Sequence, residues 1–223
     1  MPDLGAALRH GLAALSLSLS PTQIEDLLRY LTLIQKWTRV YNLTSVREPE
    51  QMLTHHLLDS LAVIEPLRRQ LATLPGSAQP LQPTRLLDVG SGAGLPGVVI
   101  AICCPSISVD CVDSVAKKAA FVQQVAASLR LANLRGVHAR VEGLREKYQV
   151  ISARAFSSLS ELTTLSSSAM ADPGIWLAMK GAYPADEVVA LPRSVQVFHV
   201  EQLVVPGLDA RRCILWLRRT AAA

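Results

Sequence analysis

The chain has 223 residues, half of them hydrophobic, which suits one α/β domain with an appendage or two small domains. Its formal charge of +4 is mild but favours a nucleic-acid partner, with a solvated basic surface as the alternative. The longest apolar stretch, around Val98 to Cys104, is far shorter than the roughly 20 residues that cross a bilayer. The N-terminus also lacks a signal-peptide pattern, so we expect a cytoplasmic protein with no membrane partner.

The first 72 residues predict a helical region. Leucines in residues 1–19 fit a short helix. Ser20-Pro21-Thr22-Gln23 is a capping box with proline at the first helical position, and apolar residues at helical spacing follow it, which predicts a helix from 21 to about 40. The run 41–45 breaks this pattern, and Glu48-Pro49 begins another helix that we expect to reach about Leu67.

Polar residues on this second helix allow two interpretations. His56, Asp59 and Ser60 can share one helical face and suggest a metal or acid–base site. A third metal ligand at useful spacing is lacking, so we do not expect zinc. We favour the interpretation that these groups bond to the neighbouring turn Asn42-Leu-Thr44 and clamp the N-terminal helices onto a sheet.

Residues 73–84 predict a linker, because residues 74–84 hold three prolines and a glycine. From 85 to 223, short apolar runs alternate with helical patterns, which predicts a doubly wound parallel sheet. Two β-rich runs at the end predict a closing antiparallel pair. We expect strands at 85–89, 108–112, 136–139, 149–153, 174–179, 195–205 and 213–217, and helices at 95–103, 115–131 and 158–170.

The run Asp88-Val-Gly-Ser-Gly-Ala-Gly-Leu-Pro-Gly97 lies between an apolar strand and an apolar helix, the layout of a nucleotide-type cofactor site. Gly92, Gly94 and Gly97 fit the dinucleotide pattern, and Asp113 stands where a ribose-binding acid belongs. A nicotinamide-dependent reductase is therefore one hypothesis. Asp88 argues against it, because a carboxylate there would face a pyrophosphate, whereas it suits the sulfonium and amino group of S-adenosylmethionine. Alternatively, Asp88 and Asp113 cap the helices that follow them.

This run also resembles the first motif of class I methyltransferases. With five further motifs in order, the chain from about Pro21 to Leu217 resembles the small-subunit rRNA methyltransferase G family, also called glucose-inhibited division protein B. The motifs are Tyr41-Asn-Leu-Thr-Ser45, His56-Leu-Leu-Asp-Ser60, Arg140-Val-Glu142, Ser152-Ala-Arg-Ala-Phe156 and Lys180-Gly181. The resemblance implies a Rossmann-like, seven-stranded, mostly parallel sheet with the last strand antiparallel and an N-terminal helical cap. It also implies methyl transfer from S-adenosylmethionine, leaving S-adenosylhomocysteine, to N7 of a guanine in 16S rRNA.

The resemblance implies which residues of this sequence contact the cofactor. These contacts fall on Gly90 and Leu95 in the glycine loop, on Val141 and Glu142 after the third strand, and on Arg154 at the end of the fourth. Asp113 would take the ribose hydroxyls, and Asp88, Gly92 and Gly94 complete the predicted set. Two positions depart from relatives: His55 replaces a usual Arg or Lys, which weakens any claim that a charge there holds RNA, and Cys213 replaces a His found in some.

Arg154 and Lys180 are the candidate active-site residues. Arg154 either pairs with Asp88 or Glu142 as a buried bridge or touches the cofactor or the incoming base. Lys180 follows a strand and should point toward the crevice at the strand ends. The candidate RNA contacts, each with solvated surface charge as its alternative, are Lys117, Lys118, Arg140, Lys180 and Arg212.

Guanine N7 carries a lone pair and no proton, so its methylation needs no general base, and the sequence offers no convincing one. The remaining alternative is a nucleotide-sensing RNA-binding module without activity. We expect a monomer that acts on 16S rRNA or the small ribosomal subunit. We expect the four cysteines to be reduced core residues, with no metal site; they are Cys103, Cys104, Cys111 and Cys213.

Overall fold

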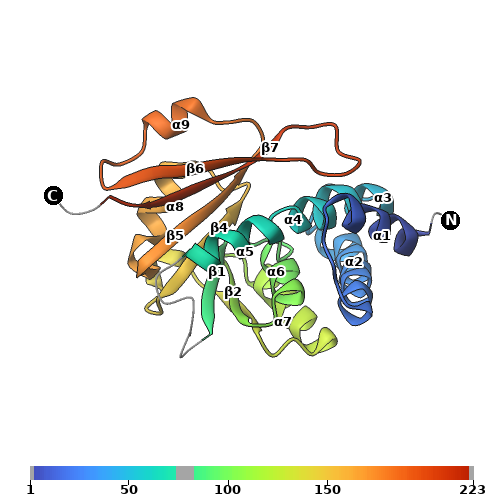
Figure 1. Cartoon of the computed structure of the whole chain (residues 1–223). Coiled ribbons are helices and arrows are strands. Elements are labelled where there is room, and N and C mark those ends of the chain that lie inside the picture. The colour runs from blue at the N-terminus through green and yellow to red at the C-terminus, as the bar shows by residue number, and fades with distance from the viewer. Residues whose placement is uncertain (1–2, 74–82, 221–223) are drawn as a thin grey trace.

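The computed structural model describes residues 3–73 and 83–220, so most of the predicted linker lies outside the described residues. A seven-stranded sheet in the order β3-β2-β1-β4-β5-β7-β6 forms the centre of the molecule (Figure 1). β7 runs antiparallel to both of its neighbours, and the other pairings are parallel. The strands are β1 (Thr84–Val89), β2 (Ile107–Asp113), β3 (Leu134–His138), β4 (Tyr148–Arg154), β5 (Met170–Lys180), β6 (Val195–Leu203) and β7 (Arg212–Arg219). The predicted parallel sheet and antiparallel closing pair are confirmed.

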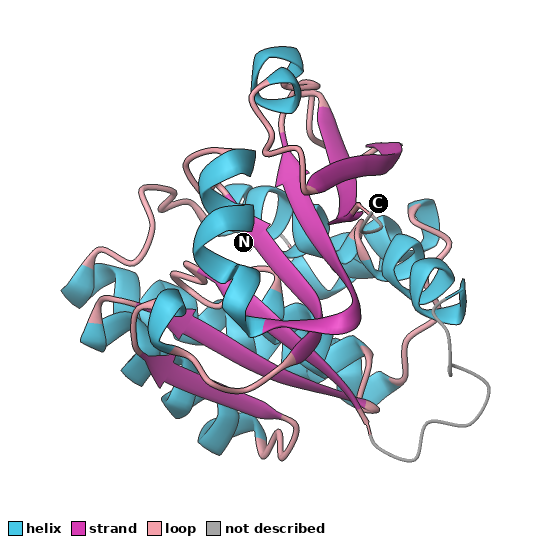
Figure 2. Ribbon diagram, turned by 90° about the vertical axis from the view of Figure 1, so that its left-hand side faces the viewer, coloured by secondary structure: helices cyan, strands magenta, loops and turns pink. Residues whose placement is uncertain are grey.

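Helices cover both faces of this sheet (Figure 2). Successive strand residues point to opposite faces, so Leu86 joins the core beneath α6 and α7, while Leu87 joins the core beneath α8. The helices that flank the sheet are α6 (Gly97–Cys103), α7 (Ala116–Leu129), α8 (Leu159–Ser166) and the short α9 (Ala185–Val189). Within the described residues, no helix is both long and apolar enough to span a membrane.

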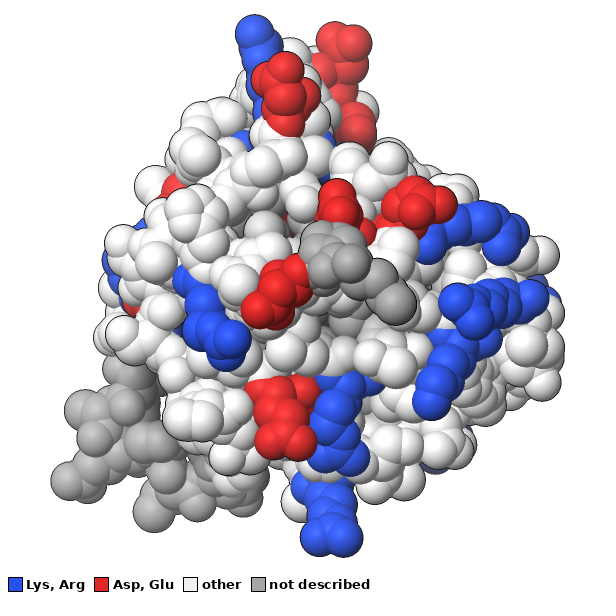
Figure 3. Space-filling view, turned by 90° about the vertical axis from the view of Figure 1, so that its right-hand side faces the viewer, with Lys and Arg blue, Asp and Glu red and all other residues white. Residues whose placement is uncertain are grey.

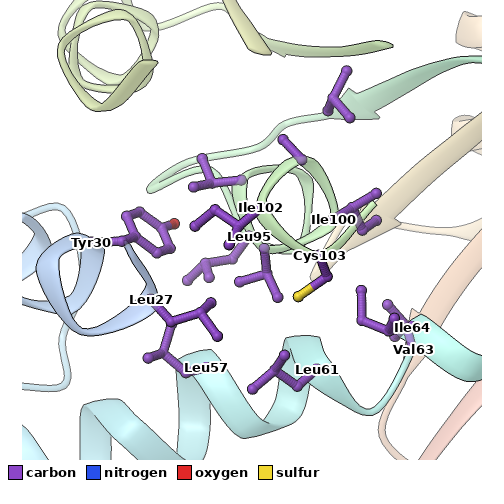
Figure 4. Packing of buried hydrophobic residues seen from close by; sticks show 14 of the residues in the cluster. Leu27, Tyr30, Leu57, Leu61, Val63, Ile64, Leu95, Ile100, Ile102 and Cys103 are labelled. Atoms are coloured by element: carbon purple, nitrogen blue, oxygen red, sulfur yellow. The ribbon is translucent and has the colours of Figure 1, made fainter. Parts of the chain in front are cut away.

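The N-terminal helices pack onto α6 and share its core. They are α1 (Leu4–Ala14), α2 (Pro21–Tyr41), α3 (Pro49–Met52), α4 (Asp59–Leu61) and α5 (Ile64–Thr73). The capping box at Ser20 and Gln23 is present as predicted. In Figure 4, Leu27 from α2 and Leu61 from α4 surround side chains of α6 such as Ile102. The Tyr30 hydroxyl donates to the Ala93 carbonyl at 2.5 Å, which ties α2 directly to the glycine loop.

Two element boundaries differ from the sequence predictions. The helix expected from 48 to about 67 contains a π-helical turn, Leu53–Leu58, and extends as α5 to Thr73. β5 begins at Met170 rather than 174, so the helix expected to reach 170 ends as α8 at Ser166, followed by a 3-10 turn. The Asp172-Pro173-Gly174 run sits in an irregularity of the β4–β5 pairing, where Tyr148 faces Met170 but Val150 faces Ile175. Such turn-forming residues are tolerated in a strand at a bulge.

Candidate active site

A cavity of about 330 Å³ opens at the carboxyl ends of β1, β2 and β3. This is the edge where ligands bind in open α/β sheets. Its lining is apolar and polar in about equal parts, and its polar side chains comprise three carboxylates, one guanidinium and one serine. It is lined by Val89, Gly90, Val112, Asp113, Ser114, Ala139, Arg140, Val141, Glu142, Phe156, Glu161 and Leu165. We call this space the first cavity.

Gly90 lies where the chain leaves β1 and enters the glycine loop. Its φ of +64° is in the left-handed region that favours glycine, and its N–H donates to the Val112 carbonyl at 2.9 Å. A Cβ added at Gly90 would lie 3.2 Å from Cδ2 of Phe156. A side chain here would therefore fill the space between the loop and that ring.

Asp113 ends β2 and lies at the wall of the first cavity. Its Oδ2 accepts from the Gly92 N–H at 3.0 Å, and its Oδ1 accepts from the Val115 N–H at 2.9 Å. The second bond ends on Val115, the N-cap residue of α7, and α7 has no side-chain cap hydrogen bond, so Asp113 does not cap this helix as the alternative from the sequence had it. Lys118 approaches the same carboxylate at 3.7 Å. Asp113 thus links the glycine loop to the start of α7 while lining the cavity.

Asp88 is fully buried at the end of β1. Its Oδ2 accepts from the Gly97 N–H at 3.0 Å, at the start of α6, and its Oδ1 accepts from the Ser152 hydroxyl at 2.8 Å. Burial raises the pKa of this carboxyl from 3.8 to about 6, although the hydrogen bonds from Ser152 and Gly97 oppose the rise. The helix-capping alternative is therefore present in the structure, and a direct cofactor contact for Asp88 stays a prediction.

The remaining loop residues form the turn behind the first cavity. Gly92 and Gly94 have positive φ, and the Gly94 N–H donates to the Ser91 carbonyl at 2.7 Å. Leu95 is buried in the core beneath α2. Gly97 permits a close approach, because a Cβ there would lie 2.4 Å from the Cys111 sulfur. These residues shape the loop, and their contacts with a cofactor stay predictions.

A second cavity of about 570 Å³ adjoins the first, and Phe156 lines both. The second cavity lies between the N-terminal helices and the ends of β4, β5 and β7. Its lining is His55, His56, Asp59, Arg154, Ala155, Phe156, Ser157, Met179, Lys180, Gly181 and Arg212. The sequence predictions placed Arg154, Lys180 and Arg212 near this edge but gave no role to Phe156, which was quoted only as part of a motif.

One carboxylate binds two of the cations that line the second cavity. Asp59, whose side chain is only 4% exposed, accepts from Arg154 Nη1 at 2.9 Å and from Arg212 Nε at 2.8 Å. Arg154 Nη1 also donates to the His55 carbonyl at 3.0 Å. The predicted pairing of Arg154 with Asp88 or Glu142 is wrong, because α4 brings a nearer carboxylate to the end of β4. Asp59 thus joins the N-terminal helices to β4 and β7.

Lys180 is also paired. Its Nζ donates to Glu187 of α9 at 2.7 and 3.0 Å, and the ammonium lies at the cavity wall as predicted. Arg140 lines the first cavity. Lys117 and Lys118 lie in the first turn of α7, and Lys118 approaches Asp113, which lines that cavity. Contact of these side chains with RNA stays a prediction.

His56 bonds to the turn that precedes its helix, as the clamp interpretation predicted. Its Nε2 lies 2.9 Å from the Thr44 hydroxyl oxygen. Burial, reinforced by the nearby Arg154 charge, lowers the pKa of His56 to about 4, so the imidazole is neutral at neutral pH. Asp59 departs from the clamp interpretation because it bonds to Arg154 and Arg212. Ser60 Oγ has no hydrogen-bond partner among the described residues.

All four cysteines are buried free thiols, as predicted. Burial raises the pKa of each of them, which keeps the thiols protonated. In the part of the chain that the structure describes, no group of three or more His, Cys, Asp or Glu is placed to hold a metal ion.

Comparison with known proteins agrees with this arrangement. The family model for rRNA small subunit methyltransferase G matches residues 23–215. The chain belongs to this family. A relative from Albidiferax ferrireducens, named ribosomal RNA small subunit methyltransferase G, is 66% identical and covers 99% of this chain and 100% of its own length. A relative of the same name from Acidovorax sp. strain JS42 is 60% identical, covering 96% of this chain and 95% of its own. The family resemblance seen in the sequence is confirmed.

Solved structures show the fold. A methyltransferase from Geobacter sulfurreducens, in complex with S-adenosyl-L-homocysteine, has a TM-score of 0.51 at 14% identity, covering 86% of this chain and 98% of its own. Coclaurine N-methyltransferase, bound to N-methylheliamine and S-adenosyl-L-homocysteine, has a TM-score of 0.55 at 11% identity, covering 98% of this chain and 96% of its own. The architecture is the predicted class I methyltransferase fold.

The first cavity fits S-adenosylmethionine better than a dinucleotide. Asp113, Glu142 and Glu161 place three carboxylates around it, against the single guanidinium of Arg140. A diphosphate would be repelled by this set, whereas S-adenosylmethionine carries no phosphate and has a net positive charge. The apolar side chains of Val89, Val112 and Val141 offer surfaces for an adenine ring.

Proposed function

We propose that this protein transfers a methyl group from S-adenosylmethionine to N7 of one guanine in 16S rRNA. The observation that carries the proposal is the pair of adjoining cavities at one edge of the sheet, the first acidic and the second rimmed by cations, with Phe156 common to both. Membership of the rRNA small subunit methyltransferase G family supports the same reaction. In this proposal the protein acts as a monomer on ribosomal RNA in the cytoplasm.

In this proposal the first cavity holds the adenosyl part of the cofactor. Asp113 accepts hydrogen bonds from the ribose hydroxyls, and Val141 and Glu142 contact the adenine. The backbone at Gly90 permits close approach of the reacting end, with Arg154 on the side of the second cavity. Bound S-adenosylmethionine supplies an electrophilic methyl carbon attached to a positively charged sulfur.

The second cavity holds the acceptor guanine. The lone pair on N7 of the guanine forms the new N–C bond to the methyl carbon while the bond between that carbon and sulfur breaks. The electron pair of the broken bond stays on the sulfur, which becomes a neutral thioether. The positive charge therefore moves from sulfur to the guanine, and no proton is transferred. Holding N7 in line with the methyl carbon is the main task of the protein, and orientation of this kind supplies up to roughly 7–11 kcal/mol of barrier reduction.

A general base is unnecessary for this step, and the side chains of the second cavity agree with that. His56 has a pKa of about 4 and is bonded to Thr44. A group with so low a pKa is a weak base at neutral pH. The rate of methyl transfer is therefore expected to be flat across the neutral pH range.

The basic side chains supply contacts to RNA phosphates in this proposal. Lys180 and Arg212 line the second cavity, Arg140 lines the first, and Lys117 and Lys118 lie in the first turn of α7. Lys and Arg side chains also gather on part of the face that the N-terminal helices build (Figure 3). Phosphate contacts of this kind weaken as salt rises, so the Michaelis constant for RNA is expected to increase with ionic strength.

The test is methyl transfer from labelled S-adenosylmethionine to 16S rRNA from cells that lack this protein, as naked RNA and as assembled small subunits. We expect label in one guanosine that becomes sensitive to the borohydride and aniline cleavage specific for 7-methylguanosine. Label on a base nitrogen or oxygen other than N7, or a rate that rises log-linearly with pH between about 6 and 8, contradicts the proposal.

Titration calorimetry separates this proposal from a nicotinamide-dependent reductase, and the transfer of label separates it from a nucleotide-sensing module without activity. We expect binding of S-adenosylhomocysteine and none of NADH, whereas a nicotinamide-dependent reductase would show the reverse. A nucleotide-sensing module without activity would bind S-adenosylhomocysteine and RNA but transfer no label. The acidic first cavity is the feature that favours the cationic cofactor.

A further inference from the structure

Phe156 occupies the boundary between the two cavities. Its ring is half-buried and is the aromatic side chain found in the lining of both. On one side it faces the glycine loop, where a Cβ at Gly90 would come within 3.2 Å of Cδ2. The ring is therefore held against the place where the cofactor loop begins, and it borders the space proposed for the acceptor base.

The backbone before Phe156 is strained in a way that fits a functional position. Ala155 has φ of +55°, a left-handed conformation that costs free energy for any residue with a Cβ. Asn42 and Arg130 also have positive φ, but they cap the C-termini of α2 and α7, where that conformation is common. Ala155 instead follows the last residue of β4. This kink turns the chain at the sheet edge and brings Phe156 to the boundary between the cavities.

The cations around the second cavity are already bound by carboxylates, which lowers their summed charge from +3 to +1. Arg154 and Arg212 share Asp59, and Lys180 is bound by Glu187. This arrangement matters because the acceptor guanine becomes a cation during methyl transfer, and unpaired positive charge near it would oppose the reaction. An aromatic ring would favour the reaction instead, because the partial negative charge on its face attracts a cation.

We propose that Phe156 is the platform on which the acceptor guanine stacks, and that its ring favours the positively charged transition state over the neutral base. This inference rests on the proposed function and adds a substrate-contacting residue to it. Stacking holds an unpaired base by its face, and the charge that develops on the base strengthens the contact as N7 is methylated. The contact therefore contributes to kcat as well as to KM.

The test compares Phe156→Leu, Phe156→Tyr and Phe156→Trp with the wild-type protein. Phe156→Leu keeps an apolar side chain but removes the ring, and kcat/KM for 16S rRNA is expected to fall about 5- to 150-fold, the range for loss of one base–aromatic stack. Phe156→Tyr and Phe156→Trp keep a ring and are expected to retain most of kcat/KM. Phe198→Leu is the matched control, because Phe198 is half-buried on β6 beneath Arg218, outside both cavity linings.

A second readout uses the product. Inhibition by 7-methylguanosine 5′-monophosphate and by guanosine 5′-monophosphate is measured with each variant in the presence of S-adenosylhomocysteine. We expect the methylated, cationic nucleotide to inhibit the wild-type protein more strongly, and Phe156→Leu to lose this preference. Equal inhibition of the wild-type protein by the two nucleotides, including none by either, contradicts the inference.

The affinity for S-adenosylhomocysteine shows whether Phe156 stacks on the acceptor base or instead has only a structural or cofactor-binding role. The dissociation constant of S-adenosylhomocysteine is expected to stay within about 3-fold of wild type in Phe156→Leu, a difference below 1 kcal/mol. A loss of cofactor affinity as large as the loss of kcat/KM overturns the inference, as does an unchanged kcat/KM. If the wild-type protein itself transfers no methyl group to 16S rRNA, the proposed function fails instead.

Discussion

Replacing Asp88 by Asn tests the electrostatics at the base of the glycine loop. The carboxylate is fully buried and accepts one hydrogen bond from the Gly97 N–H and one from the Ser152 hydroxyl. Asn has the same shape and keeps an oxygen that can accept from Gly97, while its amide can donate to the Ser152 oxygen. The substitution therefore removes the ionisation and little else.

Burial raises the pKa of Asp88 from 3.8 to about 6. One pKa unit corresponds to about 1.4 kcal/mol, so a rise of about two units corresponds to about 3 kcal/mol. Because the folded state binds this proton more tightly than the unfolded chain, the stabilisation is complete below pH 3.8 and is lost as pH rises through about 6. Relative to Asp88→Asn, the wild-type protein should therefore become more stable by about 2–3 kcal/mol between about pH 7 and about pH 4.

Urea unfolding of both proteins, followed by circular dichroism at steps of pH, measures this difference directly. Other titrating groups are common to the two proteins and cancel in the difference between their unfolding free energies. A difference that does not change with pH would mean that Asp88 keeps an ordinary pKa. A difference of the opposite sign would mean that the two hydrogen bonds outweigh the cost of burial.

Two further substitutions test the ion pairs at the second cavity and the close packing behind the glycine loop. Asp59→Asn removes the carboxylate that two arginines share, and it should lower the free energy of unfolding by about 2–3 kcal/mol. This loss is smaller than for a fully buried pair because both guanidinium groups are partly exposed. A urea midpoint equal to that of the wild-type protein refutes this prediction. Gly97→Ala places a Cβ 2.4 Å from the Cys111 sulfur, and overpacking should destabilise the protein by about 1–3 kcal/mol. Gly143→Ala is its control, since nothing lies within 4 Å of the added Cβ, and an equal loss in both variants would show that the close approach is not the cause.

The sheet and the glycine loop were predictable because their signals are local. Short apolar runs separated by helical patterns specify a parallel sheet, and the capping box at Ser20 specifies the start of α2. The prediction for β5 was incomplete because Pro173 and Gly174 usually mark a turn, whereas here they lie in a bulge of the strand. That outcome depends on the neighbouring strand and is not encoded within the segment.

The partners of charged residues were less predictable than the residues themselves. Arg154 was correctly placed at the end of a strand, but its ion pair with Asp59 joins positions far apart in sequence. The π-helical turn at Leu53–Leu58 immediately precedes Asp59 and changes which side chains share a face, so a regular helical pattern assigned this carboxylate to the wrong neighbours. A single sequence carries no signal for such a choice of partner.

The pairing of these cations with carboxylates explains how a basic protein is suited to forming a cationic product. RNA phosphates favour positive charge around the second cavity, yet methylation of N7 disfavours it beside the base. Asp59 and Glu187 reduce this conflict, because together they offset two of the three positive charges at the cavity wall, while the more distant basic side chains attract the RNA backbone. The same reasoning explains why an aromatic ring, rather than another charged group, lies between the two cavities at Phe156.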